Sequence, residues 1–248
     1  MAPTYLHGAE VIEILNGPVP IRLARTAVIG VVGTAPTGPV NQPTVLYSED
    51  DHAQFGPELE GFTIPQLLKA VRDHGAGTVI VINVLDPAEH TDNITDEAVS
   101  FNANTGKAQL SKGAISNLVL SDGDATTYTL GTDYVITDAA KGIIQRLPGG
   151  SIPTTPGTVA DFSFADPSAV VAADVIGTVD VAGQRSGLQA LRNTYALFGL
   201  KAKILAVPVY STQNAIRAEM DVLAHELKAI ALADAPIDTT PQQAIEGR

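Results

Sequence analysis

Three groups of residues in this chain could in principle do chemistry, and the first is a set of glycines. Gly30, Gly33 and Gly38 follow an apolar run, where a phosphate-binding loop would follow a strand. Their spacing is not Gly-x-Gly-x-x-Gly, no Lys-Ser or Lys-Thr follows, and Pro36 and Pro39 lack the N–H groups that hold phosphate. We therefore interpret the segment as a strand that leaves into a turn, and we predict no cofactor site there.

Histidine and serine side chains form the second group, which could make a hydrolytic triad or a metal site. No Gly-x-Ser-x-Gly elbow is present, and no two histidines lie at the spacing of metal ligands. The histidines are His7, His52, His74, His90 and His225. We read them as surface residues on loops and helix ends and predict no catalytic residue and no metal ligand.

Clustered carboxylates form the third group. Glu49, Asp50 and Asp51 fall in the first turn of a predicted short helix, where negative charge is favourable without any catalytic role. Asp122 and Asp124 flank a glycine but lack the further ligands and the distal glutamate of a calcium loop. Asp-Gly is first of all a turn signal, so a hairpin turn explains this pair.

Composition excludes several classes of function. The 248 residues are 45% hydrophobic and 17% charged, which suits a well-packed core, and the net charge of −12 disfavours binding to nucleic acid. No apolar run approaches the roughly 18 residues of a membrane span, and no secretion signal opens the chain. The absence of cysteine fits either a cytosolic origin or an assembly that needs no redox chemistry.

Apolar runs and helical periodicity predict an α/β layer on both sides of a more polar middle region. The runs at 27–32 and 78–85 are apolar on both faces, as in covered parallel strands. Between them we predict a helix that Thr63 caps and Gly75 terminates. Further predicted elements are a strand at 43–47, a short helix at 49–55, a polar loop at 86–96, a helix at 187–198, a buried strand at 202–209, a helix to about 228 capped by Ser211, and a strand at 229–233. The helix at 187–198 should place Leu188, Leu191, Tyr195 and Phe198 on one face.

The sequence pattern of the middle region predicts antiparallel β structure. Short alternating segments separated by Gly, Asp and Asn turns lie at 98–102, 107–110, 117–120, 126–130, 134–137, 143–147 and 158–164. We predict an α/β domain made of residues 21–96 and 166–248, with an inserted antiparallel β domain at 97–165. Insertion into a surface loop costs little free energy.

Residues 1–20 are predicted to be an extended N-terminal arm. Apolar and acidic side chains mix on both faces of its strand, so it lacks a clean core face in its own domain. Such a strand can pair with a sheet edge in another subunit. The apolar side chains that we predict for this strand-exchange interface are Tyr5, Leu6, Val11, Ile12 and Ile14.

Several of these segments, in their order along the chain, resemble the tail sheath proteins of contractile phages and the sheaths of phage-tail-like bacteriocins. The opening Tyr-Leu-His-Gly-Ala-Glu-Val is one such segment. The others lie at 27–36, 131–134, 142–144, 149–150, 182–191, 203–210 and 223–236. The resemblance runs from Tyr5 to Pro236.

The resemblance implies a subtilisin-like α/β fold as an architecture only, because no Asp, His and Ser occupy protease roles. It implies a non-enzymatic subunit that polymerises around a tail tube and contracts, in the virion tail, after assembly in the bacterial cytoplasm. Its partners would be copies of itself, the tail tube protein, and baseplate and tail terminator proteins, without cofactor, nucleic acid or membrane. Family members continue into a C-terminal domain that receives such arms, so we expect the chain to stop inside a larger protein.

Two alternatives remain at this point. An α/β hydrolase or nucleotide-dependent enzyme with a β insertion would need a pocket with convergent polar groups at the carboxyl ends of the strands. A receptor- or carbohydrate-binding β insertion would need an aromatic or charged concave surface, and only 5% of the residues are aromatic.

Overall fold

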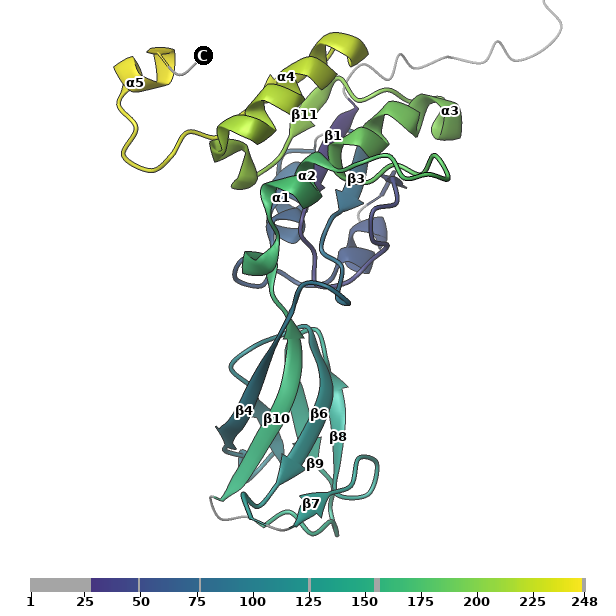
Figure 1. The fold of residues 1–248 in the computed structure, drawn as a ribbon. Coiled ribbons are helices and arrows are strands. Elements are labelled where there is room, and N and C mark those ends of the chain that lie inside the picture. The colour runs from purple at the N-terminus through teal and green to yellow at the C-terminus, as the bar shows by residue number, and fades with distance from the viewer. Residues whose placement is uncertain (1–27, 49, 76, 125, 154–156, 247–248) are drawn as a thin grey trace, which may run out of the picture.

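The computed structural model describes residues 28–48, 50–75, 77–124, 126–153 and 157–246. Two parts are visible in Figure 1. We call the part built around the parallel sheet the α/β body, and the part formed by residues 91–165 the β module. The predicted arm, with Tyr5, Leu6, Val11, Ile12 and Ile14, lies outside the described residues.

A five-stranded sheet with the order β12-β11-β1-β3-β2 forms the centre of the α/β body. Its strands are β1 (Ile29–Gly33), β2 (Thr44–Leu46), β3 (Val79–Asn83), β11 (Ile204–Ala206) and β12 (Ile230–Leu232). All neighbouring pairs are parallel except β2 with β3. Apolar runs covered on both faces are typical of parallel strands, as in β1 and β3, and the predicted layer of mixed helices and strands is confirmed.

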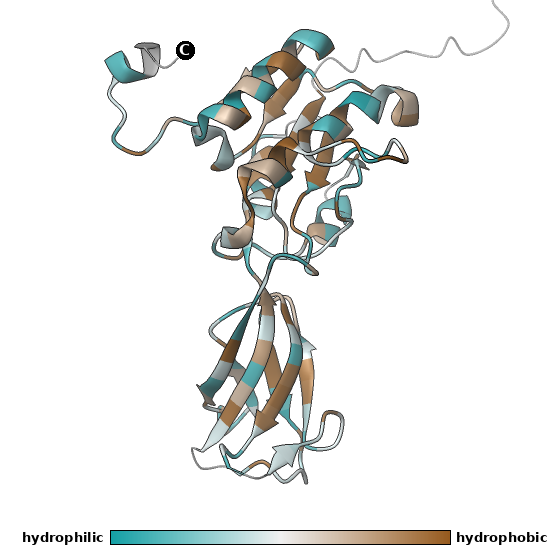
Figure 2. Cartoon of the chain, viewed as in Figure 1, coloured by the Kyte–Doolittle hydropathy of each residue, from teal (hydrophilic) through white to brown (hydrophobic). Residues whose placement is uncertain are grey.

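Helices cover the two faces of this sheet unequally. On one face, α1 (Thr63–Asp73) packs Ile64 and Leu68 against Val31 and Val81, with the 3-10 helix η1 (Asp50–Phe55) beside it. The other face is covered by α2 (Ala172–Ile176), the 3-10 helix η3 (Gly187–Asn193), α3 (Thr194–Phe198) and α4 (Asn214–Leu227). Figure 2 shows the resulting contrast between largely apolar strands and mixed helices.

The direction of the crossovers explains this arrangement. From β1 the chain moves through α1 to β3, whereas from β3 to β11 and from β11 to β12 it moves across the sheet in the opposite direction. Crossovers of one hand place their helices on opposite faces when they move in opposite directions. The remaining short elements are η2 (Pro167–Ala169), η4 (Tyr210–Thr212) and α5 (Pro241–Glu246).

Two antiparallel sheets pack together in the β module. One has the order β4-β10-β6-β7 and the other β5-β9-β8. The strands are β4 (Thr91–Val99), β5 (Lys107–Gln109), β6 (Ile115–Ser121), β7 (Thr127–Tyr128), β8 (Tyr134–Asp138), β9 (Ile143–Arg146) and β10 (Thr158–Ala165). Leu120, Tyr134, Ile144 and Phe162 meet in a core separate from those of the α/β body.

Two predicted elements differ in extent from the structure. The predicted polar loop at 86–96 is wrong in its second half, because β4 begins at Thr91 and pairs along its length with β10. This strand was missed because most of its side chains are exposed, so it shows no apolar alternation. The predicted buried strand at 202–209 is ordered as a strand only over Ile204–Ala206.

The predicted face of the helix at 187–198 is only half correct. Leu188 and Leu191 are buried, but Tyr195 is 59% and Phe198 38% exposed. The segment begins as a 3-10 helix, whose three residues per turn rotate the later side chains away from the core.

Ser211 does not cap α4, which begins at Asn214. Its hydroxyl instead accepts a hydrogen bond from the N–H of Asp234, at 2.9 Å.

In the Gly-Thr-Asp-Tyr segment of the β module, the side chain of Asp133 holds two backbone segments together by hydrogen bonds. The Asp133 carboxylate accepts hydrogen bonds from the N–H groups of Ser151 and Thr129, both at 2.7 Å, and these bonds hold the pKa of Asp133 below its usual value. The next residue, Tyr134, is 2% exposed and donates its hydroxyl to the Leu118 carbonyl at 3.1 Å. This corner therefore joins the two sheets of the module.

Removing that hydroxyl tests the corner. We expect Tyr134→Phe to lower the free energy of unfolding by about 1 kcal/mol, because the buried Leu118 carbonyl loses its donor. Tyr195→Phe is the matched control, since Tyr195 is exposed, and it should change stability little. Urea denaturation of both variants measures the difference, and equal effects would contradict the role assigned to Tyr134.

Candidate functional site

The carboxyl ends of the parallel strands are where an α/β enzyme would bind its ligand. At the end of β1, the Thr34 carbonyl accepts hydrogen bonds from the N–H groups of Thr63 and Ile64, at 3.1 and 3.0 Å. In return, Thr63 Oγ1 accepts the N–H of Thr34 at 3.1 Å. The first N–H groups of α1, which would hold an anion, are therefore occupied by the chain itself.

The side chain of Asn83 binds backbone N–H groups at the carboxyl end of the neighbouring strand β3. Its Oδ1 accepts hydrogen bonds from the N–H groups of Ala35 and Leu85, at 3.0 and 3.1 Å, and the side chain is buried. The interpretation of the glycine-rich segment as a strand leaving into a turn is confirmed by these contacts. The prediction that Thr63 caps α1 is wrong, because Phe62 is the N-cap and Thr63 is the first residue of the helix, with its hydroxyl directed to the end of β1. Sequence reasoning missed Asn83, because a single polar residue at the end of a strand carries no distinctive pattern.

The contact between Thr63 and the end of β1 requires a glycine at position 33. A Cβ at Gly33 would overlap with Thr63 Oγ1. The glycine therefore allows α1 to approach β1 closely, and this packing explains the glycine without a bound phosphate.

A double-mutant cycle tests this packing. We expect Gly33→Ala to destabilise the chain by about 1–3 kcal/mol through the clash with the Thr63 hydroxyl. Thr63→Ala should also destabilise, because the Thr34 N–H loses its acceptor. The double variant should lose less stability than the sum of the two, since removing the hydroxyl removes the clash. Strict additivity in thermal denaturation would contradict this explanation.

His90 is buried where the α/β body meets the β module, so the prediction that it is a surface residue is wrong. His90 Nδ1 accepts the N–H of Asp86 at 3.0 Å, and its Nε2 lies 3.2 Å from Asp174 Oδ2. The same carboxylate oxygen accepts the N–H of Val171 at 2.8 Å. Nδ1 therefore fixes the turn that precedes β4, and Nε2 joins this turn to α2, which makes His90 a structural link.

A shallow groove of about 330 Å³ runs along this junction. The Lys112 ammonium lies 5.4 Å from the centre of the Phe164 ring, and Leu59 of the body contacts the module at Gly113, where a Cβ would lie 2.7 Å from Leu59 Cδ1. The two parts therefore touch through packed side chains as well as through the chain crossings visible in Figure 1.

An ion-pair network fastens η3 to α4. Arg192 Nε donates to Glu226 Oε2 at 2.6 Å, and Arg192 Nη2 lies 3.3 Å from Glu219 Oε1. The hydrogen bond to Glu226 raises the pKa of Arg192, and the same bond lowers the pKa of the Glu226 carboxyl. The network holds one helical layer of the body together.

This network predicts a pH dependence. Because the pKa of Glu226 is lowered in the folded state, its contribution to stability is present above the usual value of 4.5 and is lost as the pH falls through the lowered pKa. Glu226→Gln should therefore lower the melting temperature by no more than a few degrees at pH 7, because water screens this half-exposed pair. The difference should vanish in acid.

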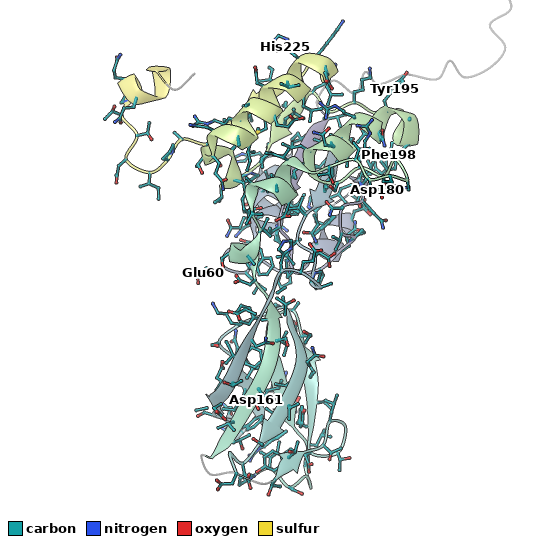
Figure 3. All side chains as sticks on the ribbon, in the orientation of Figure 1. Glu60, Asp161, Asp180, Tyr195, Phe198 and His225 are labelled. Carbon is teal, nitrogen blue, oxygen red and sulfur yellow. The ribbon has the colours of Figure 1, made fainter. Side chains whose placement is uncertain are left out.

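Glu60→Gln is the control for this measurement, since Glu60 is exposed, lies at the junction (Figure 3), and is not one of the carboxylates that act on Arg192. A Glu226→Gln effect that stays constant from pH 7 to acid would contradict the assignment.

Exposed apolar side chains gather on one side of the body. They come from α3 and from the turn at 178–186, and we call them the α3 patch: Val179, Val181, Tyr195, Leu197 and Phe198. A hollow of about 300 Å³ connects the two segments, because Gln184, Arg185 and Leu197 all line it. Figure 3 shows Tyr195, Phe198 and Asp180 on this same side. Exposed apolar side chains that lie together are a candidate surface for contact between proteins.

In the described parts of the chain, no group of three or more His, Cys, Asp or Glu side chains is arranged to hold a metal ion. Within the same residues, no helix has the length and apolar character needed to cross a membrane.

The chain is a mixed α/β protein. Its own side chains occupy the backbone groups at the ends of β1 and β3, and the α3 patch is exposed on its surface. No family model matches the chain. Its whole length is 52% identical, over 252 aligned residues, to the tail sheath protein of Burkholderia phage BcepMu, of which it covers 52%. A putative prophage major tail sheath protein of Pseudomonas aeruginosa strain UCBPP-PA14 is 44% identical over 68 residues, 27% of this chain and 18% of that protein.

The predicted resemblance to phage tail sheath proteins is confirmed by this identity along the whole chain. The chain spans about half the length of the BcepMu protein.

Two solved sheath tail proteins were also found. One is from Listeria innocua, with 12% identity, a TM-score of 0.34, and coverage of 88% of this chain and 50% of that one. The other is from Desulfitobacterium hafniense, with 14% identity, a TM-score of 0.36, and coverage of 89% and 50%. Scores this low carry no structural conclusion.

Proposed function

We propose that this chain is a structural part of the contractile tail sheath of a phage or phage-like particle. The single observation that supports this most strongly is the 52% identity to the BcepMu tail sheath protein along all of the chain. In this proposal, copies of the protein polymerise around a tail tube and later contract, which drives the tube through the host envelope. The protein acts in the virion tail and assembles in the cytoplasm of the host bacterium.

The proposed partners are other copies of the same protein, the tail tube protein, and the baseplate and tail terminator proteins. The exposed apolar α3 patch offers a surface for such contacts. The net charge of −12 gives no support to a direct contact with nucleic acid.

The proposed architecture assigns a role to each region. Residues 21–96 and 166–248 would form the sheath's subtilisin-like α/β domain, and residues 97–165 an inserted domain on the outside of the sheath. Support for the insertion comes from the separate core of the β module, whose chain leaves and re-enters the α/β body at one junction. Residues 1–20 would be an arm that adds a strand to a neighbouring subunit through Tyr5, Leu6, Val11, Ile12 and Ile14.

Contraction needs no nucleotide in this scheme. The free energy would be stored at assembly, in subunit contacts that can repack in a second and more favourable way. Arms that remain paired would keep neighbouring subunits connected while the bodies rotate. The alternative of an α/β enzyme is not favoured, because Thr34, Thr63 and Asn83 occupy the strand ends where its substrate would bind.

Polymerisation of the natural gene product that contains these 248 residues tests the proposal. We expect it to form striated tubes or contracted cylinders in negative-stain electron microscopy, alone or with its tube protein. Monodisperse particles that hydrolyse peptide or nucleotide would contradict the proposal.

The arm is tested separately in the same assay. Ile12→Asp combined with Ile14→Asp should abolish tube formation and leave the melting temperature unchanged, because charge on the donated strand prevents its burial in a neighbour. Glu10→Gln is the matched control in the same segment and should still assemble. Loss of folding in the double variant would show that the segment belongs to its own domain.

A further inference from the structure

One edge of the parallel sheet is covered on a single face. Ile204 and Ala206 of β11 pair in register with Ile230 and Leu232 of β12, so these four side chains share a face. Ile230 is 67% and Leu232 55% exposed. Ala231 points to the opposite face, where it packs against the core that contains α4.

The same face is well covered further along the sheet. Ile29 and Val31 of β1 pair with Ile204 and Ala206 and lie in the core beneath α1. The helices that follow β3 cross in the other direction and lie on the other face, so none of the described helices reaches the β11–β12 side. We call this surface, made of Ile204, Ala206, Ile230 and Leu232, the bare face.

The outer edge of β12 is also open. In the described part of the chain, β11 is the sole partner of β12, and the N–H of Ile230 is directed to the Lys203 carbonyl at 2.9 Å. The N–H and C=O groups of Ala231 must therefore point away from β11. Edge strands that remain exposed are usually protected by lysine, proline or a bulge, and Ile-Ala-Leu contains none of these.

Parallel sheets in stable proteins are covered on both faces. An open apolar edge and an open apolar face at the same strand therefore call for an element that covers both. The surface is continuous with the core of the α/β body and carries no charged side chain, which is the character of a permanent contact.

We propose that the bare face is covered by the same polypeptide, through the part of a full-length sheath protein that lies outside the present match. This inference rests on the proposed function, because this chain covers only 52% of the BcepMu sheath protein and the other half supplies the covering element. The path of the chain supports it as well. Residues 233–238, directly after β12, are all exposed, and Figure 1 shows α5 held away from the body.

A second copy of the chain is the competing occupant. Edge-to-edge pairing of two β12 strands would bring together two molecules that each carry a net charge of −12, and like charges oppose such an association. If the same polypeptide covers the bare face, no second charged molecule has to approach, and the contact does not depend on protein concentration.

Cysteine labelling tests the proposal directly, because the chain contains no cysteine. Leu232→Cys reports on the bare face, and Ile230→Cys is a second reporter at the same surface. Leu197→Cys is the matched control, since Leu197 in the α3 patch is 60% exposed. Each variant is labelled with a maleimide dye in the 248-residue chain and in the monomeric natural gene product, with any cysteine outside these residues replaced by serine.

We expect the labelling rate at position 232 to be at least about tenfold lower in the natural gene product than in the 248-residue chain, and the rate at 197 to differ by less than about twofold. Equal rates at 232 would overturn the proposal. Protection that is already present in the 248-residue chain and increases with its concentration would also overturn it, because a second copy would then be the cover.

The labelling result can be separated from the assembly result. If position 232 is protected but the gene product forms no tubes, the proposed cover of the bare face is supported and the proposed sheath function is refuted. If the gene product forms tubes while position 232 stays reactive, the sheath function is supported and the cover of the bare face is refuted.

Discussion

The need to cover a parallel sheet on both faces governs this molecule. Val31 and Val81 must be buried on one side, and Ile80 and Ile82 on the other, so helices are required on both. The hand of the crossovers then decides which helix lies where. The close approach of α1 at Gly33, the layer fastened by Arg192 and the bare face at β12 all follow from this one requirement.

The way the sheet is covered also bears on what the molecule can do. An α/β enzyme leaves the carboxyl ends of its strands open to a ligand, whereas here Thr63 and Asn83 use the donors and acceptors at those ends for packing. At the junction, both ring nitrogens of His90 are similarly engaged, and Nε2 holds the start of β4 to α2. The features that remain free are apolar surfaces, which suits a protein whose work is contact with other polypeptide.

Local patterns in the sequence were sufficient for the parallel strands, α1 and most of the β module, because these elements bury apolar side chains with clear periodicity. They failed for β4, whose exposed polar side chains hide a strand held by its partner β10. They failed for Tyr195 as well, because nothing in the local pattern distinguishes a 3-10 helix from an α-helix. The closure by Asn83 depends on contacts 48 residues apart along the chain, which no single-segment pattern can reveal.

Helical reconstruction by electron cryomicroscopy of assembled tails would test the central claim most directly. We predict a repeating layer around the tail tube in which the α/β body of each copy lies nearer the axis and the β module lies outermost. Tails in which this chain forms no helical layer, or in which the β module faces the tube, would contradict it.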